Sequence, residues 1–172
     1  TTDSKDMLSK VIFNISLPLM LFTNFFRLEA TPRLIANSIT ILAISGFVIF
    51  FLLFVGWLTA KIFRLQGSEA AVFKVHAMFG NTIFLGFPLI TALYGVEGLL
   101  YASMFQLVST IIMWTVGVII LSQGNGALWK KSLPKVINPN TIATVTGLIC
   151  FILSVRLPDI LLKPMTELGS AN

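Results

Sequence analysis

Five apolar segments alternate with short polar segments along this chain. A membrane-spanning helix needs about 20 mostly apolar residues, and the segments that approach or exceed this length are Val11–Phe26, Leu34–Ala60, Val75–Tyr94, Gly98–Leu121 and Thr141–Leu157. The second is long enough to cross a bilayer at a tilt, and the first is short. The pattern predicts an all-α integral membrane protein with about five transmembrane helices. A final stretch, residues 160–172, begins apolar and then stops, and we expect it to be a cut end.

The composition agrees with a membrane protein and limits the chemistry. Of 172 residues, 56% are hydrophobic and only 11% are charged, whereas soluble domains carry about 25% charged residues. The single cysteine, Cys150, excludes a disulfide within the chain, and we interpret it as a packing residue. Because there is no CxxC motif and no His/Cys cluster, the sequence predicts no metal and no cofactor.

The basic residues indicate the orientation in the membrane. The net charge is +5, but the basic residues lie between apolar segments and form no stripe, so we expect no nucleic-acid partner. The linkers on one side of the predicted membrane carry eight basic residues: Lys5, Lys10, Lys61, Arg64, Lys74, Lys130, Lys131 and Lys135. The opposite linkers carry four: Arg27, Arg33, Arg156 and Lys163. The positive-inside rule therefore predicts a cytoplasmic N-terminus and a cytosolic linker at residues 122–138.

The third apolar segment contains the most informative motif, GNTIFLGFPLITALYG at residues 80–95. Pro88 lacks an N–H and its ring clashes with the carbonyl group of Phe84, while Gly86 accepts unusual backbone angles. The sequence therefore predicts that the helix breaks at Gly86–Pro88. This point lies about 18 Å along the helix from Val75, near the middle of a hydrocarbon core about 30 Å thick.

A helix broken at this depth predicts a binding site for a transported solute. The half-helix that begins there directs free N–H groups and its positive dipole end inward, which suits a carboxylate, and the half-helix that ends there offers free carbonyl groups. The predicted substrate-binding residues are Asn81, Thr82, Gly86, Phe87 and Pro88. The alternative is a purely structural proline kink whose freed groups are satisfied by neighbouring helices.

Three further residues are accessory candidates. Asn14 and Pro18 form a weaker break, NISLP, which we interpret as a kink in a supporting helix in preference to a second site element. His76 could relay protons, but an interfacial polar residue is the preferred interpretation. All seven acidic residues fall in linkers or at segment ends, which argues against a cation antiporter with buried aspartates and against a membrane hydrolase. The sequence therefore predicts that the protein is not an enzyme.

The broken segment also follows a specific pattern, NTxxxGxPLxxAxYG, from Asn81 to Gly95. This pattern resembles the crossover helix of the auxin efflux carrier family, which includes plant auxin exporters and bacterial permeases for small organic acids. NISLPLMLF resembles the second helix of that family and INPNTIATVTGLICF its sixth, so the resemblance covers essentially the whole chain.

The resemblance implies ten helices in two inverted five-helix repeats, with broken helices crossing at the fourth and ninth positions. Residues 1–121 would then be helices two to five, with the crossover helix at about 75–94. Residues 122–138 would be the cytosolic linker, and residues 139–172 helix six and the beginning of helix seven. The first helix and most of the second repeat are expected to be missing, and Asn81 with Gly86–Pro88 would form one half of the substrate site.

Together these observations predict a secondary active transporter of a small organic anion, such as a carboxylate or an auxin-like acid, that works by alternating access. The expected partners are the organic anion and the lipid bilayer, with proton or sodium coupling and a homodimer left open. The expected location is a bacterial inner (plasma) membrane, crossed several times. The alternatives are a sodium-coupled transporter of the bile acid symporter type and a membrane-embedded ligand sensor without net transport.

Overall fold

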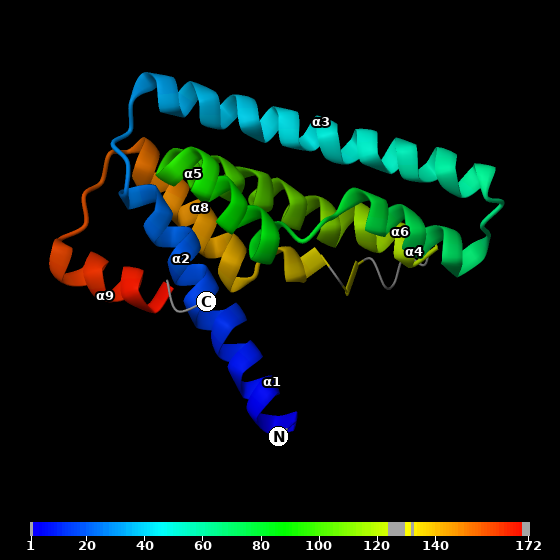
Figure 1. Cartoon of the computed structure of the whole chain (residues 1–172), viewed down its shortest axis with the longest axis horizontal. Helices are drawn as coiled ribbons and strands as arrows, with labels where there is room; N and C mark the ends of the chain where they lie inside the picture. Colours follow the sequence, from blue (N-terminus) through cyan, green and yellow to red (C-terminus); the bar gives the residue numbers. More distant parts are fainter. Residues whose placement is uncertain (1, 124–129, 132, 170–172) are drawn as a thin grey trace.

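A computed structural model describes residues 2–123, 130–131 and 133–169, and every regular element within these ranges is a helix (Figure 1). The α-helices are α1 (Thr2–Val11), α2 (Leu17–Thr23), α3 (Pro32–Ile62), α4 (Gly67–Met78), α5 (Phe87–Ile112), α6 (Val118–Leu121), α8 (Pro139–Ile152) and α9 (Asp159–Gly169). Shorter π and 3₁₀ turns are η1 (Ile12–Ser16), η2 (Asn24–Phe26), η3 (Thr82–Gly86), η4 (Met113–Gly117) and η5 (Leu133–Val136).

The first apolar segment is one helical rod made of α1, η1, α2 and η2. In its π turn, the N–H of Leu17 bonds to the carbonyl oxygen of Ile12, five residues earlier. Pro18 follows directly, at the start of α2, so the wide turn absorbs a proline that cannot donate a hydrogen bond. The α1 end projects away from the other helices, while α2 lies among them (Figure 1).

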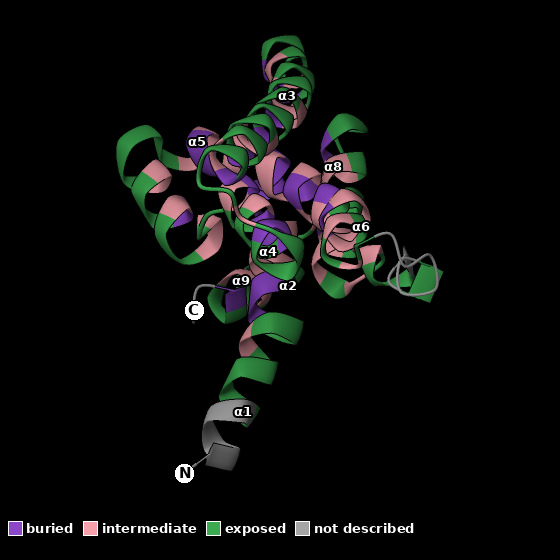
Figure 2. Ribbon diagram, turned by 90° about the vertical axis from the view of Figure 1, so that its right-hand side faces the viewer, coloured by how far each residue is buried: buried purple, intermediate pink, exposed green. Residues whose placement is uncertain are grey.

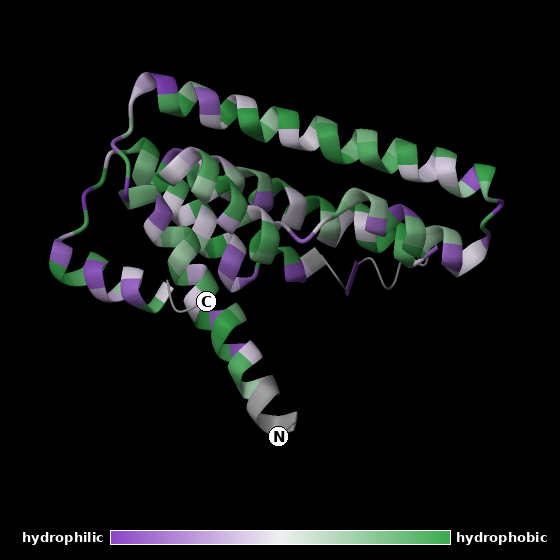
Figure 3. Cartoon of the chain, viewed as in Figure 1, coloured by the Kyte–Doolittle hydropathy of each residue, from purple (hydrophilic) through white to green (hydrophobic). Residues whose placement is uncertain are grey.

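The longest helix, α3, begins at a well-formed cap and presents an apolar surface outward. The Thr31 side chain accepts a hydrogen bond from the N–H of Leu34 at 3.2 Å, and Pro32 occupies the first turn. At 31 residues the helix is about 46 Å long, which is enough to cross a hydrocarbon core of about 30 Å. Much of its surface is both exposed and hydrophobic (Figures 2 and 3), as expected for a helix in contact with lipid.

The next stretch, Gly67–Leu121, contains two arms that fold back on each other. Gly95 has φ 62° and ψ −148° inside α5, a conformation that glycine adopts most readily. A Cβ placed on Gly98 would lie 3.0 Å from the carbonyl oxygen of Ile90, whereas eight residues of straight helix span about 12 Å. The chain therefore reverses at Gly95, between the third and fourth predicted spans.

Within the residues that the structure describes, three stretches are long and apolar enough to cross a membrane: Met7–Phe26, Pro32–Ile62 and Gly67–Leu121. Because the third reverses at Gly95, it supplies the third and fourth predicted segments. The all-α membrane fold is therefore confirmed. The fifth segment differs from its prediction, because the helix covers only Pro139–Ile152. The chain turns out of the helix at Ser154, which has the left-handed angle φ 53°. The N–H of the next residue, Val155, then donates a hydrogen bond to the carbonyl oxygen of Cys150.

The connections gather at two ends of the molecule. One pocket is lined by Trp57, Gly67 and Gln123, which brings together the α3–α4 turn and the end of α6. Another pocket brings the α2–α3 connection together with the segment after α8, where Arg156 forms an ion pair with Glu29 at 2.8 Å. This grouping agrees with the sides assigned from charge. Part of the predicted linker 122–138, namely residues 124–129 and 132, lies outside the described residues.

Candidate functional site

The helix break lies at Phe79–Asn81, not at the predicted Gly86–Pro88. Helix α4 ends at Met78, Phe79 is extended at φ −126° and ψ 124°, and η3 begins at Thr82. Gly86 and Phe87 both have right-handed helical angles, so helical structure is continuous through the proline. The sequence therefore predicted a broken span correctly and placed its break about two turns too late.

The physical reason is a second π turn. The N–H of Phe87 bonds to the carbonyl oxygen of Thr82, and the N–H of Gly86 bonds to that of Asn81 at 3.2 Å, each five residues back. This wider turn accommodates Pro88 without breaking the helix, as η1 does before Pro18. Both prolines stand two residues after a five-residue π turn.

Asn81 caps the second half-helix. Its Oδ1 accepts a hydrogen bond from the N–H of Phe84 at 3.1 Å, the usual contact of an asparagine N-cap. Because Oδ1 faces a backbone donor, the Nδ2 group points elsewhere, and it has no hydrogen-bond partner among the described residues. The residue is exposed. Asn81 therefore presents a free amide donor beside the positive end of a helix dipole.

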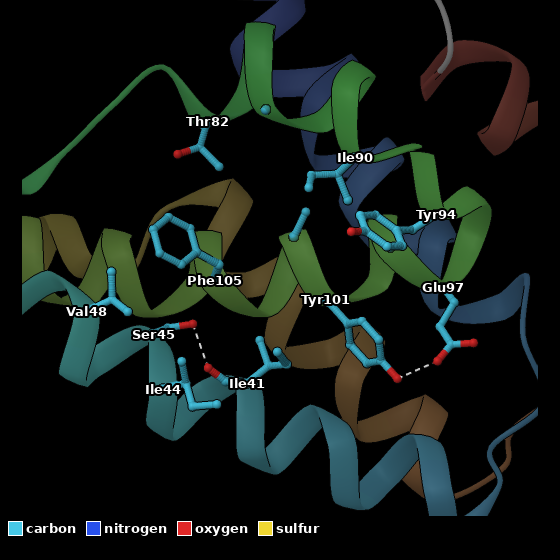
Figure 4. A pocket seen from close by; sticks show the side chains of 13 residues that line it. Ile41, Ile44, Ser45, Val48, Thr82, Ile90, Tyr94, Glu97, Tyr101 and Phe105 are labelled. Carbon is cyan, nitrogen blue, oxygen red and sulfur yellow. Dashed lines mark hydrogen bonds between the residues drawn. The ribbon is translucent and has the colours of Figure 1, made fainter. Parts of the chain in front are cut away.

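A pocket of about 650 Å³ adjoins this half-helix on the side of α3. Thr82 and Gly86 line it, together with one face of α3 and both arms of the α5 hairpin (Figure 4). The remaining lining residues are Ile41, Ile44, Ser45, Val48, Ile90, Tyr94, Glu97, Gly98, Tyr101, Ala102 and Phe105. Such a mostly apolar cavity with a few polar groups is typical of a small-molecule site.

The structure divides the predicted site residues between two faces. Phe87 and Pro88 line a different pocket, of about 500 Å³, which lies between the first helical rod and the segment formed by η3 and α5. On that face Phe87 packs with Leu17, and the rings of Phe13 and Phe84 meet edge to face with centroids 6.0 Å apart. Asn81 thus caps the half-helix at the break, Thr82 and Gly86 line the 650 Å³ cavity, and Phe87 and Pro88 line the second pocket.

The accessory candidates lie apart from the break. Asn14 is exposed, and its Nδ2 donates to the carbonyl oxygen of Lys10 at 2.9 Å. Pro18 is buried within α2. His76 is exposed on α4 and lies 2.9 Å from the carbonyl oxygen of Val72. None of the three lines the 650 Å³ pocket.

Sequence reasoning missed a polar group at the far end of that pocket. The hydroxyl of Tyr101 donates to Oε1 of Glu97 at 2.6 Å, and Nδ2 of Asn37 donates to the Tyr101 oxygen at 3.0 Å (Figure 4 shows the first bond). The sequence pattern places Glu97 in the linker between the third and fourth apolar segments. The spacing of Glu97 and Tyr101, four residues apart on a helix, was a signal in the sequence. The sequence alone does not indicate that Asn37 joins this pair, because Asn37 lies on α3, 64 residues before Tyr101.

Comparisons with known proteins place the chain in a family. Residues 1–135 match the family described as Membrane transport protein, and this range includes the break, the 650 Å³ pocket and the first helical rod. Residues 136–172 lie outside the match. No curated protein matches the chain. Because the match covers most of the chain, and the apolar helices and the broken helix agree with it, the chain belongs to the membrane transport protein family, the auxin efflux carrier family, and is an integral membrane transporter.

Proposed function

We propose that this protein is a secondary active transporter of a small organic anion and that it works by alternating access. The observation that carries the proposal is the break at Phe79–Asn81, where a capped half-helix begins beside a cavity. The free Nδ2 of Asn81 and the N–H of Ile83, which has no acceptor among the described residues, are the donors available to a carboxylate there.

The cavity supports a substrate with an apolar body. Its lining is dominated by aliphatic and aromatic side chains, including Tyr94, Tyr101 and Phe105, which favour an organic anion over an inorganic one. Thr82, one residue after the cap, is among its lining residues. The carboxylate of a bound monocarboxylate would lie at the break, and its hydrocarbon part would lie against α3.

The wider assignments are part of the same proposal. Residues 1–121 form most of a first five-helix repeat, residues 122–138 a cytosolic linker, and residues 139–172 the start of a second, inverted repeat. A bacterial inner membrane is the proposed location, and the assembly stays open. These assignments rest on the family resemblance and on the charge distribution.

The test separates the two roles of Asn81. In the full-length protein, Asn81→Ala removes both the cap and the free donor, and we expect it to weaken binding of a carboxylate by about 1–3 kcal/mol. Asn81→Asp keeps a capping oxygen but replaces the donor with a negative charge, so binding should weaken further while the helix stays capped. The measurement is equilibrium binding of indole-3-acetate and phenylpyruvate at matched membrane expression.

The control is Asn138→Ala. Asn138 caps α8 through its Oδ1, which accepts hydrogen bonds from the N–H groups of Asn140 and Thr141 at 3.0 and 3.1 Å. This change therefore removes an equivalent cap on a helix that does not line the 650 Å³ pocket. It should lower stability without changing carboxylate affinity. If both Asn81 variants bind like Asn138→Ala, the break is only structural. Binding without uptake into liposomes would instead indicate a sensor.

A further inference from the structure

A groove of about 590 Å³ lies at the end of the molecule that holds the α3–α4 turn. It is formed by the second half of α3, the first two turns of α4 and the end of α6, which lie together in Figure 1. None of its lining residues also lines the 650 Å³ cavity. This groove, called the lateral groove below, is therefore separate from the proposed transport site.

One wall of the lateral groove is an apolar face of α3. Phe50, Leu53, Phe54 and Trp57 have the spacing i, i+3, i+4 and i+7, which places them on one side of a helix. The rings of Phe54 and Trp57 stack with their centroids 6.1 Å apart. Phe50, Phe54 and Trp57 are 50%, 56% and 45% exposed. This wall is about 10 Å long, and it offers a hydrocarbon chain an apolar surface to lie on.

Two lysines lie near the Trp57 end of this wall. Lys74 lines the lateral groove. Its Cα lies 3.5 Å from the position of a Cβ added to Gly56, so α4 meets α3 one residue before Trp57. Lys61 lies one helical turn after Trp57, and its Nζ is 5.3 Å from the centre of the Trp57 ring. Positive charge is therefore placed at the end of the groove where the tryptophan lies.

No carboxylate neutralises these lysines at contact distance. Among the described residues, the ion pair within 4 Å is Arg156 with Glu29, at the opposite end of the molecule. Glu69, on α4, lines a different pocket together with His76. Lys74 is the only charged residue among the described residues that line the lateral groove. The groove therefore combines an apolar wall with positive charge that has no acidic partner.

We propose that the lateral groove binds an anionic glycerophospholipid. Its phosphate lies at Lys61 and Lys74, and one acyl chain lies along the α3 wall. Basic pockets between transmembrane helices suit anionic head groups, and tryptophan is frequent at head-group depth. A soluble anion would leave the apolar wall uncovered, and the cation of a zwitterionic lipid would be repelled by the lysines. This inference does not depend on the proposed transport of an organic anion.

The charge pattern of the chain supports this choice of lipid. The basic residues of the linkers predict that this end of the molecule faces the cytosol. Anionic lipids give the cytoplasmic leaflet its negative surface potential, and each lysine near that surface changes affinity by about fivefold. Two lysines should therefore favour an anionic over a zwitterionic lipid by about 25-fold.

The experiment counts lipids bound to the full-length protein by native mass spectrometry. The protein in detergent is titrated with phosphatidylglycerol or with phosphatidylcholine of the same chain length. The wild type should show the preference for phosphatidylglycerol, and the double variant Lys61→Gln/Lys74→Gln should lose most of it. The matched control is Lys130→Gln/Lys131→Gln, which removes two exposed charges outside the groove and should keep the preference.

A second measurement locates the bound lipid without changing either lysine. Phosphatidylglycerol brominated on its acyl chains should quench tryptophan fluorescence of the wild type in phosphatidylcholine liposomes. Trp57→Phe should remove part of that quenching. Phosphatidylcholine brominated in the same way, at the same mole fraction, should show a smaller difference between the two proteins.

Four results would overturn the inference. Equal binding of the two lipids by the wild type would remove the selectivity. Equal losses in the two double variants would show that general surface charge attracts the lipid. Displacement of phosphatidylglycerol by inorganic phosphate would make the ligand a soluble anion. Quenching that Trp57→Phe leaves unchanged would show that another segment of the full-length protein, or a second copy, covers the groove.

Discussion

Gly98 is a residue at which the two arms of the α5 hairpin approach each other closely. A Cβ at this position would lie 2.6 Å from the Cβ of Tyr94 and 3.0 Å from the backbone oxygen of Ile90. Backbone atoms cannot move aside cheaply, so Gly98→Ala should destabilise the protein by about 1–3 kcal/mol. The measurement is thermal unfolding in detergent.

Gly46→Ala provides the comparison for this prediction. Gly46 lies within α3, and an added Cβ there meets no atom within 4 Å. This change should stabilise the helix by about 0.5–1 kcal/mol. Equal effects of the two variants would mean that the arms are not packed as described.

At the scale of one residue, the sequence predicted features set by neighbouring residues better than contacts between distant segments. The sequence predicted Asn81 as a substrate-binding residue from its neighbours in the chain, and that role stays a prediction. Its observed role as an N-cap follows from local chemistry. Glu97 was not identified, because its meaning depends on the reversal at Gly95 and on Asn37, which is 64 residues from Tyr101. Contacts between distant segments leave no periodic trace in one sequence.

At the scale of the element, the crossover helix shows how a proline can mislead. Gly86 and Pro88 have the propensities of a break, but an enlarged hydrogen-bonded turn absorbs both, and the chain interrupts its helix at Phe79–Asn81 instead. Local propensity therefore predicted that the span is broken. The position of the break depends on the hydrogen bonds of the π turn, which keep the chain helical through Pro88.

Pro88→Ala tests the role of this turn. Alanine restores an N–H that can bond to the carbonyl group of Phe84, so the π turn should relax toward an α-helix and shift the register of the break. We expect transport to fall while membrane insertion and stability are retained. Flux at matched expression is the measurement.

Two controls accompany the proline variant. Pro139→Ala changes a proline in the first turn of α8, and Cys150→Ala changes a residue that we assign to packing. If Pro88→Ala transports as well as both controls, the turn has no part in the transport cycle.

At the scale of the whole molecule, the charge pattern and the packing agree on which connections share a side. The prediction from charge is that Ser68, in the first turn of α4, faces the cytosol. Because Cys150 is the only cysteine of the chain, Cys150→Ala provides a background for labelling single introduced cysteines. Ser68→Cys should resist a membrane-impermeant thiol reagent added to intact cells.

Glu29→Cys, at the opposite end, should react with the same reagent. Reaction at Ser68→Cys together with protection at Glu29→Cys would show that the orientation is inverted. Ser132, which the charge pattern places on the cytosolic side, lies outside the described residues.

The paired π turns have a geometric consequence for how this protein can change. A π turn contains one residue more than an α-helical turn, and each residue of an α-helix rotates the chain by about 100°. The turn at Thr82–Gly86 therefore sets the angular phase between Asn81 and the rest of α5. A deletion of one residue within it would turn the Asn81 amide by about 100° relative to α5 without altering that side chain. Changes in segment length there act as a rotation about the helix axis.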